Sequence, residues 1–171
     1  MNSVLQDLNK SGKTEENEVG SVNHALVQTR LIRALPGEKF VIATELSLDV
    51  SSLEKNLLGS LGIINELKPD ICLYPIGTLK FIKPVLGDDI VRYNLPPVTS
   101  IEIVSPSQSS QKIVAKFRAY FAFGVKTCWL VEPVLEVVSV YTSMSEHRIF
   151  SILDGEVVDD EIRVSIAKIF E

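Results

Sequence analysis

Residues 96–132 read PPVTSIEIVSPSQSSQKIVAKFRAYFAFGVKTCWLVE, and this stretch decides the fold. An apolar run around Glu102 predicts a short strand, and the Ser/Pro sequence that follows it predicts a turn. Apolar residues at helical spacing over residues 109–123 predict a helix, and the sequence TCWLV at 127–131 predicts a second strand. The unit is therefore strand, helix, strand.

A single acid lies in the first of these strands. Glu102 is flanked by residues that read as buried on both faces of a sheet, namely Ser100, Ile101, Ile103 and Val104. An isolated carboxylate in such a run would cost several kcal/mol of desolvation, so a cation has to compensate its charge. Two cations are available: a divalent metal shared with a second acid, or Lys116, two helical turns into the following helix. The alternative is that Glu102 points from an edge strand into water.

Length and composition indicate one globular domain. A chain of 171 residues can bury roughly two thirds of its unfolded surface. Hydrophobic residues make up 46% and charged residues 23%, which suggests neither disorder nor a membrane protein. No apolar run approaches the roughly 20 residues of a membrane span, and the amino-terminal sequence lacks the apolar core of a signal peptide. We expect a mobile arm at residues 1–17, a single domain at 18–171 and a cytoplasmic location, with no membrane partner.

Neither the cysteines nor the net charge points to a function by itself. Cys72 and Cys128 lie in predicted strands without ligand spacing to each other or to His24 and His147, so we expect two reduced core residues and no zinc site. The formal net charge of −5 argues against indiscriminate coating of nucleic acid.

The central unit is nevertheless basic inside an acidic protein. No Asp or Glu lies between Glu102 and Glu132, whereas four cations do: Lys112, Lys116, Arg118 and Lys126.

The sequence before the central unit predicts a helix, two strands and two irregular connections. The helix covers 18–35 and ends at Pro36 and Gly37. The strands cover 39–48 and 70–74. The segment between them, 49–67, suits either a helical turn or a loop, because its leucines favour a helix and its glycines weaken one. Residues 75–94 predict an irregular connection, with a short strand at 79–82.

The sequence after the central unit predicts two more strands, at 137–142 and 148–153, and a turn at Asp154 and Gly155. Residues 163–169 either close the sheet or cap it. The order of helices and strands predicts an α/β protein, with a mixed central sheet flanked by helices.

Two acids could form a metal site if Asp70 and Glu102 lie on neighbouring strands at the same end of the sheet. Two nearby carboxylates repel each other, and hard oxygen ligands suit Mg²⁺ or Mn²⁺. The backbone carbonyl of Ile103 could complete the coordination, and Lys116 could orient a water or stabilise charge in phosphodiester cleavage. The alternative interpretations are a turn residue at Asp70 and a solvated lysine at Lys116.

Three pieces of the chain, LKPDICLYP, IEIVSPSQSSQKIVAKFRAYFAFGV and CWLVEP, resemble a large bacterial family of proposed endonucleases. That family belongs to the restriction-endonuclease-like PD-(D/E)XK nuclease superfamily. The resemblance covers roughly residues 20–145 and is most specific over 101–133. It implies a restriction-endonuclease-like fold and metal-dependent cleavage of nucleic acid.

The resemblance also implies roles for individual residues. The family's metal carboxylates fall on Asp70 and Glu102, and its catalytic lysine, moved to the following helix, falls on Lys116. Glu45 matches an acid common in these relatives and is a further candidate metal or water ligand. His24 matches a histidine at the start of the first helix, for which a structural or capping role is the alternative.

Three positions depart from the family's pattern. Relatives often carry Asp where this chain has Val98 and an acid where it has Lys112, and the superfamily usually has lysine where it has Val104. These departures leave Asp70, Glu102 and Lys116 in place.

Two hypotheses follow for the function. The first is a Mg²⁺- or Mn²⁺-dependent DNA endonuclease that acts as a homodimer and binds phosphates through Lys112, Arg118 and Lys126. The second is a catalytically silent protein of the same fold that binds nucleic acid or serves in assembly.

Overall fold

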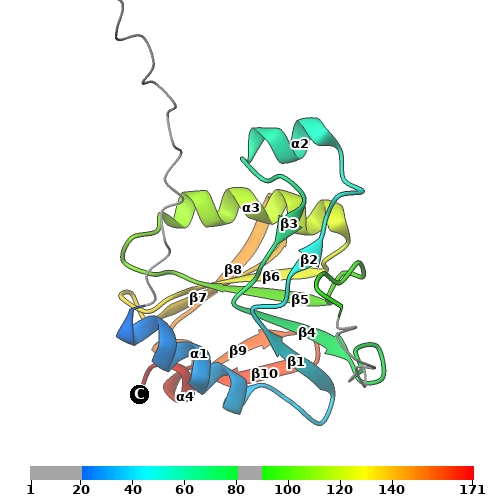
Figure 1. Ribbon diagram of the computed structural model, residues 1–171. Helices are drawn as coiled ribbons and strands as arrows, with labels where there is room; N and C mark the ends of the chain where they lie inside the picture. The colour runs from blue at the N-terminus through cyan, green and yellow to red at the C-terminus, as the bar shows by residue number, and fades with distance from the viewer. Residues whose placement is uncertain (1–20, 81–89) are drawn as a thin grey trace, which may run out of the picture.

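The computed structural model of the chain describes residues 21–80 and 90–171. Its centre is a six-stranded mixed sheet in the order β1-β4-β5-β6-β7-β8, with helices on both faces (Figure 1). The predicted mixed sheet flanked by helices is thus confirmed, and the expected arm at 1–17 lies outside the described residues. The sheet is formed by β1 (Phe40–Thr44), β4 (Ile71–Pro75), β5 (Thr99–Ile103), β6 (Thr127–Glu132), β7 (Val137–Ser143) and β8 (Glu146–Phe150).

The strand, helix, strand unit forms as predicted. β5 and β6 pair in parallel, α3 (Ser110–Phe123) connects them, and every other neighbouring pair in the central sheet is antiparallel. α3 ends at Gly124, whose φ of 110° is a left-handed conformation that favours glycine. A Cβ at this position would lie 3.2 Å from Cγ of Pro96, so the chain turns tightly into β6.

Alternation along the strands gives the sheet two apolar faces. On one face, Ile101 and Trp129 pack in a core with Leu31 of α1 (Val22–Ala34) and Ile166 of α4 (Ile166–Phe170). On the other face, the core includes Leu130 of β6 together with several residues of α3. The two cysteines are free and buried, as expected. Among residues 21–80 and 90–171, no helix has the length and apolar character needed to cross a membrane.

The first helix covers most of the predicted range. Ser21 has an extended backbone and is the N-cap, with its hydroxyl accepting a hydrogen bond from the backbone N–H of His24 at 3.2 Å. α1 begins at Val22 and ends at Ala34, just before Pro36, and residues 18–20 of the predicted helix lie outside the described residues.

The predicted strand at 39–48 is divided into two. β1 ends at Thr44, and the chain turns at Glu45, which has a left-handed φ of 53°. β2 (Leu48–Asp49) then pairs with β3 (Glu66–Leu67) in a separate small sheet, and α2 (Lys55–Ser60) connects these two strands. The helical interpretation of 49–67 is therefore correct for six residues. Of the predicted strand at 79–82, the described residues Leu79 and Lys80 are not in a strand.

The carboxyl-terminal segment contains a hairpin that the sequence did not predict. β8 ends at Phe150 instead of 153, and a 3₁₀ turn at Ile152–Asp154 follows. β9 (Glu156–Asp159) pairs with β10 (Ile162–Ser165) in a sheet of its own, and α4 packs on α1. The segment 163–169 thus caps the molecule and does not join the central sheet.

Candidate active site

Asp70 and Glu102 meet at one end of the central sheet. β4 and β5 pair antiparallel with Ile71 opposite Ile101, so Asp70 stands opposite Glu102, one step beyond the last pair of the ladder. Directly opposed residues of antiparallel strands have neighbouring Cβ atoms. The backbone N–H of Ile103 donates to Oδ2 of Asp70 at 2.6 Å, and this bond joins the two strand ends.

Glu102 is buried and contacts two residues of α3. It is 4% exposed. The hydroxyl of Tyr120 donates to its Oε1 at 2.5 Å, and Nζ of Lys116 lies 3.4 Å from its Oε2. Lys116 and Tyr120 reach the same carboxylate because they are one helical turn apart. The interpretation of Glu102 as a solvated edge residue is therefore wrong, and Lys116 is the cation that faces it.

Burial makes both carboxylates harder to ionise. Burial raises the pKa of Glu102 to about 7; the charge of Lys116 opposes this shift and the nearby Asp70 adds to it. Burial also raises the pKa of Asp70, against the hydrogen bond from Ile103 and the neighbouring His24. The site is thus poor in positive charge relative to its two acids.

A second helix reaches Asp70 from the other side of the sheet. His24 Nε2 of α1 lies 3.1 Å from Oδ1 of Asp70. The side-chain amide of Gln28, one turn further along α1, donates to the backbone carbonyl of Asp70 at 3.0 Å and to Oε1 of Glu45 at 3.4 Å. Sequence reasoning missed Gln28 and Tyr120 as site residues. Each lies four positions after a singled-out residue, His24 or Lys116, and this spacing was the available signal.

Glu45 lies beside the site and bonds Asp70 through its backbone, while its carboxylate pairs with another residue. Its left-handed backbone places it in the turn after β1, where its N–H donates to the carbonyl of Asp70 at 3.3 Å. Its carboxylate forms an ion pair with Lys68 at 3.0 Å, and both side chains are about half exposed. Non-glycine residues in this conformation are often found at functional sites.

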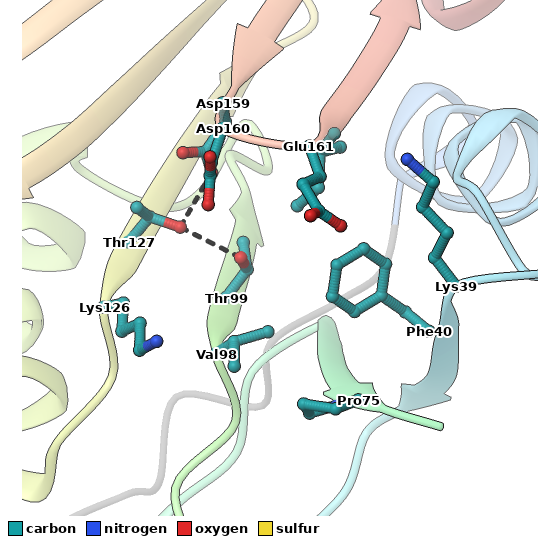
Figure 2. A pocket seen from close by; sticks show the side chains of 11 residues that line it. Lys39, Phe40, Pro75, Val98, Thr99, Lys126, Thr127, Asp159, Asp160 and Glu161 are labelled. Carbon is teal, nitrogen blue, oxygen red and sulfur yellow. Dashed lines mark hydrogen bonds between the residues drawn. The ribbon is translucent and has the colours of Figure 1, made fainter. Parts of the chain in front are cut away.

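The structure separates the basic residues that the sequence grouped together. Lys112 is exposed on α3, one turn before Lys116. Arg118 is exposed elsewhere on α3 and lines a hollow of about 590 Å³ against β7 and β8. Lys126 lies at the start of β6, at the opposite end of the sheet from Glu102, and lines a hollow of about 300 Å³ (Figure 2). Arg118 and Lys126 therefore do not belong to the cluster around Glu102.

Figure 2 also shows a second buried carboxylate, at this opposite end of β5. Oδ2 of Asp159, in β9, accepts hydrogen bonds from Nε1 of Trp129 at 2.6 Å and from the hydroxyl of Thr127 at 2.7 Å. The Thr127 hydroxyl is also 2.9 Å from that of Thr99. The network ties the β9-β10 hairpin to the central sheet.

The possible metal ligands at the site of Asp70 and Glu102 are carboxylate oxygens. Among residues 21–80 and 90–171, no three or more His, Cys, Asp and Glu side chains are grouped as a metal site. Mg²⁺ is commonly held by one or two carboxylates while it keeps several waters, so Asp70 and Glu102 match that cation in chemistry and in number. Their mutual repulsion at the end of the sheet is what a bound cation would relieve.

The fold resembles that of a protein of known structure. It is similar to the crystal structure of "a putative nuclease belonging to DUF820 from Anabaena variabilis", with a TM-score of 0.65 and 20% sequence identity over 88% of this chain and 81% of that chain. The sequence profile of the Uma2 family, described as "Putative restriction endonuclease", matches residues 10–162. The chain belongs to this family. No curated protein gives a significant match.

Proposed function

We propose that the protein is a metal-dependent endonuclease that hydrolyses phosphodiester bonds in DNA. Its family and fold support the reaction class. One observation carries the proposal. Asp70 and Glu102 lie directly opposite each other at one end of the sheet, and the amine of Lys116 lies 3.4 Å from Glu102.

Asp70 and Glu102 are the proposed ligands of Mg²⁺ or Mn²⁺. The carbonyl of Ile103 and the carboxylate of Glu45 are proposed as further ligands, because both residues border Asp70. When bound, such a cation polarises a phosphoryl oxygen and supplies hydroxide at neutral pH. The raised pKa values of both acids support this assignment, because neighbouring carboxylates with elevated pKa values favour a shared cation.

Lys116 is the proposed catalytic cation. Its side chain is 28% exposed, so its amine contacts Glu102 on one side and remains accessible to solvent. From there the amine can donate to the attacking water and stabilise negative charge that develops on the phosphate. Tyr120 donates to the other oxygen of Glu102, which keeps the carboxylate oriented for this arrangement.

Lys112 is the proposed phosphate contact nearest to the site, because it is exposed one turn before Lys116 on α3. Arg118 and Lys126 lie on other parts of the surface, so they would contact a separate length of the duplex. A homodimer would place one site on each strand, and it remains part of this proposal.

Cleavage of supercoiled plasmid in Mg²⁺ or Mn²⁺ tests the proposal. We expect wild-type protein to nick the plasmid, and Asp70→Asn and Lys116→Met to lose that activity while keeping the wild-type melting temperature within a few degrees. Lys168→Met, which removes an exposed lysine of α4, is the matched control. Cleavage that persists in both site variants would reject the assignment.

A catalytically silent protein of the same fold is the second candidate. Its support is that all four oxygens of Asp70 and Glu102 already contact donors within the protein. A silent protein would bind DNA equally well in chelator and in Mg²⁺, and calorimetry would show no specific uptake of Mn²⁺.

A further inference from the structure

Besides the backbone N–H of Glu45, three groups from two elements contact Asp70. Ile103 of β5 donates to Oδ2, as described above, and the other two contacts come from α1: His24 faces Oδ1 and Gln28 donates to the backbone carbonyl. Because His24 and Gln28 are four residues apart, they project from the same face of the helix. One face of α1 therefore contacts both the side chain and the backbone of Asp70.

The contact with His24 restricts how the Asp70 carboxylate can turn. Asp70 lies just before the first residue of β4, and the backbone bond from Glu45 to its carbonyl does not fix its side chain. With only the bond from Ile103, the carboxylate could rotate about its terminal torsion, which has a broad energy minimum. A second donor on the other oxygen fixes the plane of the group.

The contact also has a defined donor. An ionised carboxylate only accepts hydrogen bonds, so Nε2 of His24 carries the hydrogen in this contact whenever Asp70 is ionised. The cap of α1 does not use this side chain, because Ser21 is the N-cap and bonds the backbone N–H of His24. Among residues 21–80 and 90–171, the imidazole hydrogen-bonds Asp70, and its side-chain exposure is 14%.

We infer that His24 is a positioning residue, which orients the Asp70 carboxylate toward the space it shares with Glu102 so that both acids can hold one divalent cation. This inference rests on the proposed function. It assigns His24 as the hydrogen-bond partner of Asp70, one of the two proposed metal ligands. Residues that hydrogen-bond a metal ligand typically change metal affinity 10-fold to 100-fold when they are removed.

Binding of Mn²⁺ to the full chain, measured by calorimetry and by the loss of the free-ion electron paramagnetic resonance signal, tests the inference without catalysis. We expect His24→Ala to weaken Mn²⁺ binding by about 10-fold or more. His24→Gln should recover most of the affinity, since the amide nitrogen of glutamine can occupy a position close to Nε2. Asn23→Ala, at an exposed neighbouring position on α1, should bind like the wild type.

Cleavage kinetics give a second readout. In His24→Ala, the Mn²⁺ concentration for half-maximal rate should rise, while the rate at saturating Mn²⁺ stays within a few-fold of wild type. If His24→Ala does not fold, His24→Asn decides, because its shorter amide keeps the polarity but cannot reach Oδ1. Weakened binding with a wild-type melting temperature is then the expected result.

The outcomes separate the inference from the function on which it rests. Wild-type protein that binds Mn²⁺ and cleaves DNA, together with a folded His24→Ala that binds Mn²⁺ equally well, would overturn the role of His24 and leave the endonuclease intact. A His24→Gln variant that binds Mn²⁺ as weakly as His24→Ala would also overturn the role of His24. Wild-type protein that neither binds Mn²⁺ nor cleaves would overturn both proposals.

Discussion

A buried carboxylate lies at each end of β5, but the two carboxylates have different hydrogen-bond and charge partners. At the end of β5, Glu102 faces the amine of Lys116 and a second acid, Asp70. At its beginning, Asp159 of the neighbouring hairpin accepts hydrogen bonds from an indole and a hydroxyl, both neutral. Among residues 21–80 and 90–171, no ion pair forms at Asp159.

The difference separates an acid that stabilises the fold from one suited to bind a ligand. Neutral donors within the chain bond Oδ2 of Asp159, and these bonds join the β9-β10 hairpin to the sheet. Burial raises the pKa of Glu102 to about 7, the charge of Lys116 opposes this shift, and the neighbouring Asp70 adds to it. Burial alone therefore does not identify a functional carboxylate; the charges around it do.

The largest expected contrast is in catalysis. Glu102→Gln should lower the rate of plasmid nicking by about 100-fold to 1000-fold, because it removes a proposed metal ligand and leaves Lys116 without its carboxylate. Asp159→Asn should leave the rate within a few-fold of wild type. Measured kcat/KM for both variants checks this, and equal losses would show that the two ends do not differ in function.

The second contrast is in the pH dependence of stability without metal. The pKa of Glu102 is near 7 in the folded protein and near 4.5 in the unfolded chain, so its contribution is complete below pH 4.5 and is lost as the pH rises through 7. The loss amounts to about 3 kcal/mol. Urea unfolding of wild type and Glu102→Gln in chelator from pH 4.5 to 8 measures it, and a constant difference between them would contradict the prediction.

The third contrast is in the contribution of Asp159, at the beginning of β5, to the free energy of unfolding. Asp159→Ala leaves the indole N–H of Trp129 and the hydroxyl of Thr127 without their acceptor, which should cost about 2 kcal/mol of unfolding free energy at any pH between 5 and 8. Asp159→Asn keeps an acceptor and should cost less. Urea unfolding gives both values, and an Ala variant as stable as the Asn variant would show that these bonds contribute little.

The smallest effect concerns the bond from Tyr120 to Glu102. Tyr120→Phe should destabilise the protein by about 1.5 kcal/mol at pH 8, where Glu102 is ionised, and by less at pH 5. Tyr74→Phe is the matched control, because Tyr74 is also buried but donates to the neutral carbonyl of Leu95 at 2.9 Å. Its cost should not change with pH; a similar pH dependence in both variants would rule out a specific effect of Glu102.

Local sequence was sufficient to predict the strand, helix, strand unit at the centre of the fold and the acid Glu102 within it. Residues 96–132 carry their own turn and helix signals, and the two periodicities place Glu102 and Lys116 on facing surfaces. The meeting of Asp70 with Glu102 was only a conditional expectation, which the family resemblance supported, because local sequence does not show which strands are neighbours.

The remaining features depend on long-range contacts that one sequence does not encode visibly. Glu45 has a left-handed conformation, which glycine or asparagine would have predicted but glutamate does not. This turn divides the predicted strand. The acceptor role of Asp159 depends on side chains about 30 residues away. Lys126 follows the same helix as Lys116, yet the crossover carries it to the other end of the sheet.

The cluster also has an order of assembly imposed by synthesis. His24, Glu45 and Asp70 leave the ribosome first, and the amide that fixes Asp70 belongs to Ile103. Lys116 and Tyr120 follow, and parallel pairing of β5 requires β6 as well. A nascent chain that ends before α3 therefore lacks the lysine, so the centre is completed only after Lys116 and Tyr120 have left the ribosome.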